Sequence, residues 1–486
     1  MLSILGRKLR SGSVITDPDV LTSYSRDQAV VADVGCPAAA VVARTVEDVQ
    51  STLAFANDHR IPVVVRGAGS GLSGGANAID GCVVLVMTGM NQITDVSSTG
   101  LFARVEAGVI NGDLKAEARD LNLSYPPDPA SAEFSTIGGN IATNAGGLAC
   151  VKYGTTREYV MSLDVVLADG SRIETGAATR KNSAGYDLTG LIVGSEGTLG
   201  VVVGATVRLI PKPAQPATVV AIFEDLADIA DFPAELATLG ITPSMLEVMD
   251  SATINAVEDR FRMGLNRMAG ALVIAQVDSG DTRSIGAQVA GLAGDLGAVE
   301  TYVAADPAEA EMLLQARKLA YTALEQADGT ALLDDVAVPI PRLVDLIRSI
   351  QRVSDEQGVR VATFGHLGDG SLHPTIVYDA RDPGSVVRAK DAFDAIVEAA
   401  LASGGVVTGE HGVGSLKVRH LSTQLDTAAA GIHAAIKTSL DPNGILNPGK
   451  VVPLEWVTNS WGRSGEAVEL SQADEGAEPL RDGPVG

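Results

Sequence analysis

The chain has 486 residues, of which 46% are apolar and 20% are charged. This composition supplies enough apolar material for a large buried core and excludes an intrinsically disordered protein. The formal net charge of −24 repels phosphate backbones and anionic membrane surfaces, which argues against a nucleic-acid-binding protein. At roughly 100–200 residues per domain, the length predicts two to four domains.

The cysteines and the N-terminus narrow the class further. Cys36, Cys82 and Cys150 are far apart, which excludes a cysteine-built iron–sulfur cluster or zinc ribbon and argues against a disulfide framework. The N-terminal segment MLSILGRKLRSG lacks the apolar region and cleavage site of a signal peptide. No apolar run approaches the roughly 20 residues that span a bilayer. We therefore expect an intracellular, cytoplasmic protein with at most peripheral contact with the inner face of the membrane.

The first elements predict an α/β unit. Residues 38–43 are strand-like, and Thr45 followed by Asp48 has the spacing of a capping box at the start of a helix. The β-branched segment Ile61–Arg66 predicts a second strand, which leads into a glycine-rich loop. Further strands are predicted at Gly81–Met87, Ala103–Ala107, Leu163–Leu167 and Val201–Leu209.

A proline-rich segment, residues 211–216, predicts a linker between domains. The second half alternates strands, at 219–223 and 271–277, with helices that begin near Asp225 and Thr282. This alternation predicts an α+β domain with an open sheet that carries helices on one face. We also expect one long helix over 307–327, and a mobile tail over 459–486, where six carboxylates accompany two arginines.

Glycine is the compositional outlier, with 53 residues against about 34 expected at average usage. The segment Arg66–Gly75, RGAGSGLSGG, follows a predicted strand and could let backbone N–H groups approach a pyrophosphate, although it does not have the Rossmann spacing and could be a simple connection. Two further glycine-dense segments follow, at 136–147 and 194–200. Glycine loses more backbone entropy on folding than other residues, so three such segments would be an unusually high cost if they were only turns.

The ordered motifs RGAGSGLSGG, PPDPAS with TIGGNIATNAGG, and KNSAGYDLTGLIVGSEGTLG resemble the FAD-binding domain of vanillyl-alcohol-oxidase-type flavoproteins. Within that group, the chain resembles the flavin-linked D-2-hydroxyacid dehydrogenases, which include glycolate oxidase flavin subunits, D-lactate dehydrogenases and D-2-hydroxyglutarate dehydrogenases. The resemblance covers roughly residues 15–455. It implies an α+β fold: a two-subdomain FAD-binding domain and a substrate cap domain with an open antiparallel sheet.

The resemblance also implies domain boundaries and a cofactor site. The FAD-binding domain would comprise residues 1–213 and the substrate and metal-binding cap 214–440, with 441–458 returning to the FAD domain. Residues 66–73 would hold the pyrophosphate, 127–147 would follow the isoalloxazine and ribityl chain, and 196–202 would approach the adenosine. The FAD-contacting residues implied are Arg66, Gly67, Ala68, Gly69, Ser70, Gly71, Leu72, Ser73, Pro127, Asp128, Ser131, Thr136, Gly138, Gly139, Asn140, Asn144, Gly146, Glu196, Val201, Val202 and Asn447. Since the first loop contains no histidine, we expect the FAD to be non-covalent.

Three of the six histidines lie in two short motifs, GHLGDGSLHP and GEHG. Asp369-Gly370 predicts a two-residue hairpin in which His366 faces His373 with Cβ atoms about 5 Å apart. With Glu410 they would make a three-ligand site for zinc or a similar divalent ion. Taken alone, the pair could also be hydrogen-bonded core histidines.

The resemblance implies roles for this cluster. His366, His373 and Glu410 would bind the metal, and His411 would be the base that removes the hydroxyl proton while the Cα hydride passes to flavin N5. A split role for 410 and 411 requires a turn or bulge, which Gly409 and Gly412 permit. Arg317 would bind the substrate carboxylate, although an exposed helix charge is the alternative. Tyr321 could line the pocket. Lys417 could add positive charge near the metal, with a solvated lysine as the equal alternative.

The segment Ala331–Pro339 has leucine or aspartate where we expect a lysine in the hydroxyglutarate branch. D-lactate or glycolate is therefore favoured over D-2-hydroxyglutarate. A flavin-free zinc hydrolase and a non-catalytic FAD or electron-carrier subunit are the alternatives from other classes. The electron acceptor stays open among a quinone, a cytochrome, a partner subunit and oxygen.

Overall fold

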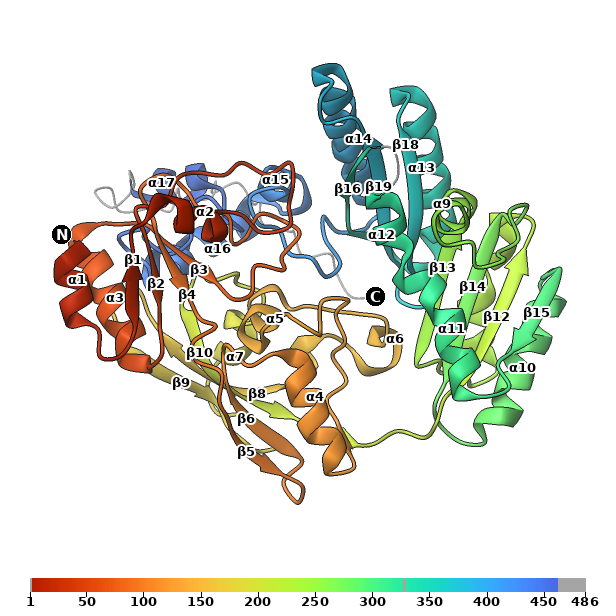
Figure 1. Ribbon diagram of the computed structural model, residues 1–486, viewed down its shortest axis with the longest axis horizontal. Helices are drawn as coiled ribbons and strands as arrows, with labels where there is room; N and C mark the ends of the chain where they lie inside the picture. Colours follow the sequence, from red (N-terminus) through yellow and green to blue (C-terminus); the bar gives the residue numbers. More distant parts are fainter. Residues whose placement is uncertain (1, 327–328, 462–486) are drawn as a thin grey trace, which may run out of the picture.

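The structure, a computed structural model, describes residues 2–326 and 329–461. Figure 1 shows two lobes. The first contains the N-terminal residues together with the last helices of the chain, and the second contains the large sheet drawn in green to teal. Among the described residues, no helix is both long and apolar enough to cross a bilayer. The predicted tail lies outside the described residues, except that α17 (Leu454–Trp461) includes its first three positions.

The first lobe begins with a four-stranded sheet in the order β1-β2-β4-β3. Strands β2, β4 and β3 are parallel, and β1 is antiparallel to β2. Both faces of the parallel strands β2, β4 and β3 are buried, which explains the continuous apolar runs in the sequence. The elements are α1 (Leu2–Lys8), β1 (Ser13–Ile15), α2 (Pro18–Ser25), β2 (Ala39–Val42), α3 (Val46–His59), β3 (Val63–Arg66) and β4 (Val83–Val86).

The predicted capping box at the start of α3 is confirmed. Thr45 Oγ1 accepts from Asp48 N at 3.3 Å, and Asp48 Oδ2 accepts from Thr45 N at 3.1 Å. The same carboxylate also accepts from Arg10 N at 2.7 Å and Ser11 N at 3.1 Å. Asp48 therefore ties the N-terminal segment to the start of the helix.

Replacing Asp48 with alanine should destabilise the protein by about 3 kcal/mol, because several partly buried N–H groups lose their acceptor together. Although burial acts in the opposite direction, these hydrogen bonds hold the pKa of Asp48 below its usual value. Its contribution is therefore present above the unfolded-state pKa and is lost as the pH falls through the lower folded-state value. Denaturant unfolding of both proteins at neutral and acidic pH measures the difference, and equal stability at neutral pH would contradict the assignment.

A five-stranded antiparallel sheet, in the order β5-β6-β10-β8-β9, completes the first lobe. Its strands are β5 (Ile93–Ser97), β6 (Phe102–Glu106), β8 (Val160–Val166), β9 (Arg172–Gly176) and β10 (Val201–Arg208). Around it lie α4 (Asn111–Asp120), α5 (Ile137–Thr143), α6 (Cys150–Tyr153), α7 (Leu188–Ile192), the short 3₁₀ helix Thr156–Tyr159, and the pair β7 (Leu123–Ser124) and β11 (Ile210–Pro211).

The second lobe is built on an eight-stranded, entirely antiparallel sheet. The predicted open antiparallel sheet is therefore confirmed. Its order is β15 (Glu300–Val303), β12 (Ala217–Phe223), β14 (Ala271–Val277), β13 (Met245–Asp250), β18 (Arg360–His366), β19 (Ser371–Tyr378) and β16 (Thr330–Leu333), with β17 (Val336–Ala337) also paired to β19.

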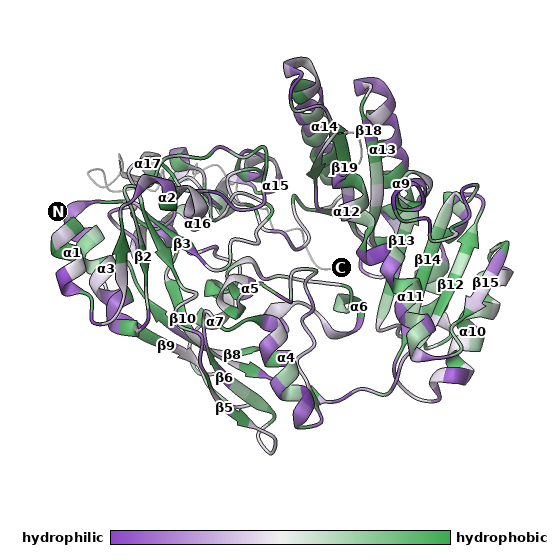
Figure 2. Cartoon of the chain, in the orientation of Figure 1, coloured by the Kyte–Doolittle hydropathy of each residue, from purple (hydrophilic) through white to green (hydrophobic). Residues whose placement is uncertain are grey.

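Helices cover both faces of this sheet, so the expectation of helices on one face was wrong. One face packs against α8 (Phe232–Thr238), α10 (Thr282–Asp295), α13 (Leu343–Gln357) and α14 (Pro383–Ala402). The other packs against α9 (Ser251–Phe261), α11 (Pro307–Lys318) and α12 (Ala320–Glu325). The central strands β12, β13 and β14 are largely green in Figure 2 because both of their faces are apolar. The predicted helix over 307–327 is two helices that meet at Leu319.

The chain returns to the first lobe after the second sheet. The contacts include those of Ser415 N and Leu416 N, which both donate to Ser73 O at 3.1 Å. The 3₁₀ turn Val418–His420, α15 (Leu421–Gln424) and α16 (Thr427–Leu440) follow. Leu446 then forms a parallel bridge with Val63. The C-terminal segment thus becomes part of the N-terminal lobe (Figure 1).

Candidate active site

A cavity of about 530 Å³ is walled by both lobes, which is within the roughly 300–1,000 Å³ typical of small-molecule and cofactor sites. The first lobe contributes all three glycine-dense segments. The second lobe contributes Lys318, Tyr321, Thr322, Glu325, Glu410 and His411. Many of the residues expected to contact FAD line it: Gly67, Ala68, Gly69, Ser70, Gly71, Leu72, Ser73, Ser131, Thr136, Gly138, Gly139, Asn140, Gly146, Glu196, Val201 and Val202.

The first glycine loop requires glycine at specific positions. Gly69 has a φ of 75°, and a Cβ there would collide with the Arg66 guanidinium. Gly414, on the facing segment, has a φ of 53°, and its Cβ would collide with Ser73 O. Residues 67–71 and 73, which line the cavity, are all glycine, alanine or serine. Little side chain therefore stands between this backbone and a bound pyrophosphate, so the wall fits the cofactor.

Five of the expected FAD-contacting residues do not line the cavity. Arg66 lies beneath the loop, where its Nη1 donates to Arg26 O at 2.9 Å, so it supports the backbone and does not present its charge to the cavity. Pro127, Asp128, Asn144 and Asn447 are likewise held by protein partners. Asn447 Nδ2, for example, donates to Glu196 O at 2.7 Å and to Gly75 O at 2.9 Å.

The histidine hairpin has a different register from the predicted one. His366 faces Ser371, and Phe364 faces His373, so the loop has four residues where a two-residue turn was predicted. The reason is that Gly368 N donates to Leu246 O of neighbouring β13 instead of pairing across the hairpin. A two-residue shift keeps every side chain on its face. The imidazoles are therefore diagonal neighbours on one face.

The structure brings together the three residues predicted to bind metal. His366 Nε2 and His373 Nε2 are 3.1 Å apart, and Glu410 Oε1 is 3.2 Å from each. All three side chains are buried or nearly so. Two imidazole nitrogens and one carboxylate oxygen, with a side open to the cavity through Glu410, are a suitable donor set for a catalytic divalent ion.

A carboxylate stands behind each of these histidines. Glu247 Oε1 is 2.6 Å from His366 Nδ1, and Asp335 Oδ1 is 3.7 Å from His373 Nδ1. When Nδ1 of each ring holds the proton that faces its carboxylate, each Nε2 lone pair is directed at the shared point. This arrangement is typical of metal-ligating histidines, so the residues fit a metal.

The charges of the cluster favour a cation at this point. Although burial acts in the opposite direction, Glu247 and Glu410 raise the pKa of His366 well above its usual value. Burial alone would raise the pKa of Glu247, but the nearby His366 and Arg317 outweigh it and lower that pKa. The same carboxylates that attract a proton attract a metal ion, so the two compete for the site.

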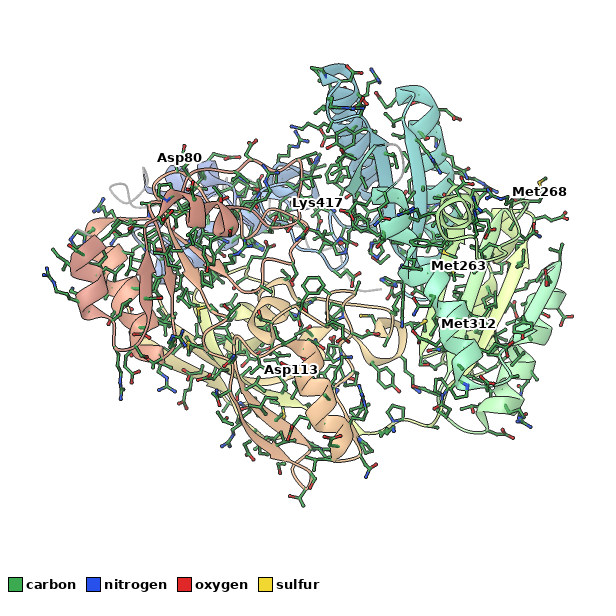
Figure 3. All side chains as sticks on the ribbon, in the orientation of Figure 1. Asp80, Asp113, Met263, Met268, Met312 and Lys417 are labelled. Atoms are coloured by element: carbon green, nitrogen blue, oxygen red, sulfur yellow. The ribbon has the colours of Figure 1, made fainter. Side chains whose placement is uncertain are left out.

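Arg317 and Lys417 both have protein partners. Arg317 Nε donates to Glu247 Oε2 at 2.7 Å, and its guanidinium lies over the Phe364 ring. Arg317 is buried and does not line the cavity, so the alternative of an exposed helix charge was wrong. Lys417 Nζ is also buried and pairs with Asp334 and with two backbone carbonyls. Lys417, labelled in Figure 3, is therefore held by residues of the second lobe and does not offer its charge to the cavity.

His411 lines the cavity, as does Tyr321. The His411 ring stacks on that of His373 with centroids 4.9 Å apart and 13° between the planes. The chain bends over 409–412, where Gly412 has a φ of 84°, so Glu410 and His411 can both reach the site. Burial lowers the pKa of His411, which favours the neutral imidazole.

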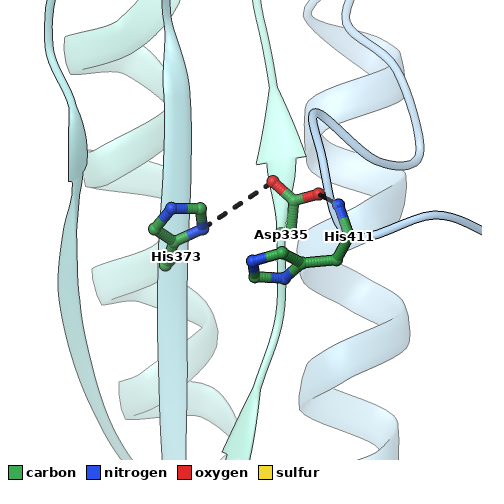
Figure 4. A group of neighbouring side chains, drawn as sticks. All are labelled: Asp335, His373 and His411. Carbon is green, nitrogen blue, oxygen red and sulfur yellow. Dashed lines mark hydrogen bonds and ion pairs between the residues drawn. The ribbon is translucent and has the colours of Figure 1, made fainter. Parts of the chain in front are cut away.

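A second cluster, Asp335, His373 and His411, also has ligand-type atoms close together (Figure 4). The oxygens of Asp335, however, already accept hydrogen bonds from the 408–411 segment and from Ser371. The cluster is therefore a hydrogen-bonded support, and the donors open to a metal are those of His366, His373 and Glu410.

Two protein families match the chain: "FAD binding domain" over residues 37–176 and "FAD linked oxidases, C-terminal domain" over residues 212–451. Glycolate oxidase subunit GlcD of Bacillus subtilis is 39% identical, over 85% of this chain and 89% of that protein. D-lactate dehydrogenase of Archaeoglobus fulgidus is 37% identical, over 84% of this chain and 89% of that protein.

Among solved structures, p-cresol methylhydroxylase has a TM-score of 0.75 at 20% identity, covering 91% of this chain and 94% of that one. 4-Ethylphenol oxidase from Gulosibacter chungangensis has a TM-score of 0.72 at 20% identity, with the same coverage of both chains. These likenesses confirm the vanillyl-alcohol-oxidase-type fold. The chain is an FAD-linked oxidoreductase and belongs to the family that contains glycolate oxidase subunit GlcD and D-lactate dehydrogenase.

Proposed function

We propose that the protein is a dehydrogenase that oxidises a small D-2-hydroxy acid, with D-lactate or glycolate favoured, to the 2-oxo acid. The observation that carries the proposal is the position of His411. It borders the glycine-walled cavity beside Glu410, whose Oε1 meets both histidine Nε2 atoms. A base and a candidate metal site thus share one wall of the cofactor cavity.

His411 acts in this proposal as the general base. Oxidation of a 2-hydroxy acid removes the hydroxyl proton and breaks the Cα–H bond, whose electron pair leaves with the hydrogen. When bound, FAD supplies the acceptor for that hydride, and a divalent cation, for which we propose zinc, supplies the charge that holds the hydroxyl and carboxylate. A buried imidazole that is neutral near pH 7 is suited to accept the proton.

We propose that residues 1–213 hold FAD non-covalently and that His366, His373 and Glu410, in the 214–440 region, hold the metal. The first loop offers no histidine for a covalent link, and the histidine on the cavity wall is the proposed base. Arg317 does not line the cavity, but we keep it as a candidate for the substrate carboxylate because Nε is the one guanidinium nitrogen that has a hydrogen-bond acceptor among the described residues, which leaves Nη1 and Nη2 for a ligand. Tyr321, on the cavity wall, is a candidate for a substrate contact.

The second-lobe wall supports a monocarboxylate. Glu325 borders the cavity, and Lys318, also on this wall, pairs with Glu311 at 2.8 Å. Asp334 and Asp335 are buried where a lysine is expected in the hydroxyglutarate branch. On this wall a second substrate carboxylate would face Glu325, and the nearby cation, Lys318, already pairs with Glu311. Turnover also needs an external electron acceptor, whose class stays open.

Anaerobic stopped-flow mixing tests the substrate class. The yellow holoenzyme should be bleached by D-lactate or glycolate, at least about tenfold faster than by L-lactate or D-2-hydroxyglutarate. Strict selectivity for L-lactate would contradict the proposed stereochemistry. Faster bleaching by D-2-hydroxyglutarate would contradict the monocarboxylate assignment, and no bleaching by any 2-hydroxy acid would contradict the function.

A further inference from the structure

Asp335 is a fully buried carboxylate between β16 and β17 of the second lobe. Its Oδ2 accepts four hydrogen bonds from consecutive residues of one segment. The donors are Thr408 Oγ1 at 2.6 Å, Gly409 N at 2.8 Å, Glu410 N at 2.8 Å and His411 N at 2.9 Å. Three successive backbone N–H groups that converge on one oxygen form an anion-binding nest.

The second oxygen of Asp335 faces the histidine hairpin. Oδ1 accepts from Ser371 Oγ at 3.1 Å and lies 3.7 Å from His373 Nδ1, which has no hydrogen-bond partner among the described residues. One carboxylate therefore touches both the 408–411 segment and the strand that carries His373 (Figure 4). These are the two parts of the second lobe that the metal site has to bring together.

The 408–411 segment packs closely against Asp335 and Ser371. A Cβ on Gly409 would crowd Ser371 Oγ and Asp335 Oδ1, so the close approach of this segment depends on glycine. Lys417 pairs with neighbouring Asp334 at 2.7 Å and also donates to the carbonyl of Asp335. The Asp335 carboxylate has no direct ion pair with an arginine or lysine among the described residues, so the N–H groups of the nest, with Lys417 nearby, stabilise its charge.

A carboxylate of the first lobe holds the continuation of the same segment. Glu196 Oε1 accepts from Val413 N at 2.7 Å, and Glu196 Oε2 accepts from Gly414 N at 3.0 Å. Ser73 Oγ also donates to His411 O at 3.1 Å. The segment 408–414 is thus held by Asp335 from the second lobe and by Glu196 from the first.

We propose that Asp335 is a positioning residue that sets the backbone of Glu410 and His411 and the Nδ1–H orientation of His373 through a single carboxylate. The inference rests on the proposed function, because it gives these three residues their roles in metal binding and base catalysis. Since a single side chain fixes ligands from two segments, its loss should loosen the loop and weaken the metal site while leaving the FAD cavity intact.

The test compares Asp335→Asn with Asp250→Asn in the full-length holoenzyme. Asp250 is a matched control, because it is also a buried carboxylate of this sheet that accepts backbone N–H groups, from Thr253 at 2.8 Å and Thr363 at 2.9 Å. Hydrogen exchange measures the amides of residues 408–411 in the metal-free protein. Competition with a chromogenic chelator measures the affinity for Zn²⁺, and flavin absorbance measures the FAD content.

Asp335→Asn should speed exchange of the 408–411 amides at least about tenfold and weaken Zn²⁺ binding by about 10–100-fold, the range found for residues that orient metal ligands. FAD content should not change. Asp250→Asn should alter neither the exchange of the 408–411 amides nor the affinity for Zn²⁺. Unchanged exchange and unchanged Zn²⁺ affinity in Asp335→Asn would overturn the proposal.

A milder variant keeps the test decisive if Asp335→Asn does not fold. Thr408→Val removes one of the four donors and leaves the carboxylate in place. It should raise exchange and weaken Zn²⁺ binding in the same direction by a few-fold, and no change in either would overturn the proposal. Failure of the wild-type enzyme to be bleached by any 2-hydroxy acid would overturn the proposed function, whereas the exchange result would still report on the loop.

Discussion

Replacing His411 with alanine should slow flavin reduction by D-lactate or glycolate by about 10²–10⁴-fold, the usual contribution of a general base. His411 borders the cavity, and its buried imidazole is favoured in the neutral, proton-accepting form. The three proposed metal ligands and the glycine loops remain, so the variant should still bind FAD and Zn²⁺. Anaerobic stopped-flow absorbance measures the reduction rate, and the visible flavin spectrum measures cofactor content.

His433→Ala is the matched control for this variant. His433 lies on α16, where its Nδ1 pairs with Ala429 O at 2.9 Å, and it does not border the cavity. Its replacement should leave the reduction rate unchanged. A His411→Ala variant that is reduced at the wild-type rate would show that another group removes the proton.

Replacing His373 with alanine should weaken Zn²⁺ binding by more than about 100-fold and should slow flavin reduction by substrate. His373 supplies one of three convergent donors, and the loss of a direct ligand should exceed the 10–100-fold effect of residues that only orient ligands. Treatment of the wild-type enzyme with a chelator should produce the same slow reduction, and added Zn²⁺ should restore it. Metal content by mass spectrometry and stopped-flow absorbance measure the two effects.

His420→Ala provides the comparison, because His420 is also largely buried and pairs with a carboxylate, Asp394, at 2.9 Å, outside the cavity wall. It should retain Zn²⁺ and its reduction rate. If chelation removes all metal and reduction by substrate stays fast, the proposed role of the metal is wrong.

Local signals in the sequence predicted local structure well. The Thr45 and Asp48 spacing identified the start of α3, because a capping box depends on four adjacent residues. The apolar run 271–277 coincides with β14. The hairpin register failed because it depends on a bond from Gly368 to Leu246, which is far away in sequence. The helices on the second face could not be assigned, since apolar runs do not tell which partner covers which face.

The carboxylates that hold the site residues in place were the hardest part of the site to predict from the sequence. Glu247 is 119 residues from His366 and 70 from Arg317, and Asp335 is 73–76 residues from the donors it holds. No local sequence pattern predicts pairs of residues that are so far apart in the chain. The available signal was a carboxylate between apolar residues, as Glu247 in the strand MLEVMD at 245–250, because a buried charge requires a partner. The sequence analysis selected Arg317 and Lys417 as site candidates, but it did not predict which residues they pair with.

Anomalous diffraction from crystals of the protein grown with FAD and Zn²⁺ tests most directly where the metal and the flavin bind. We predict one zinc peak bound by His366 Nε2, His373 Nε2 and a Glu410 oxygen, together with flavin density in the cavity walled by residues 67–73 and 136–146. Zinc bound away from these three side chains, or flavin outside that cavity, would contradict the account.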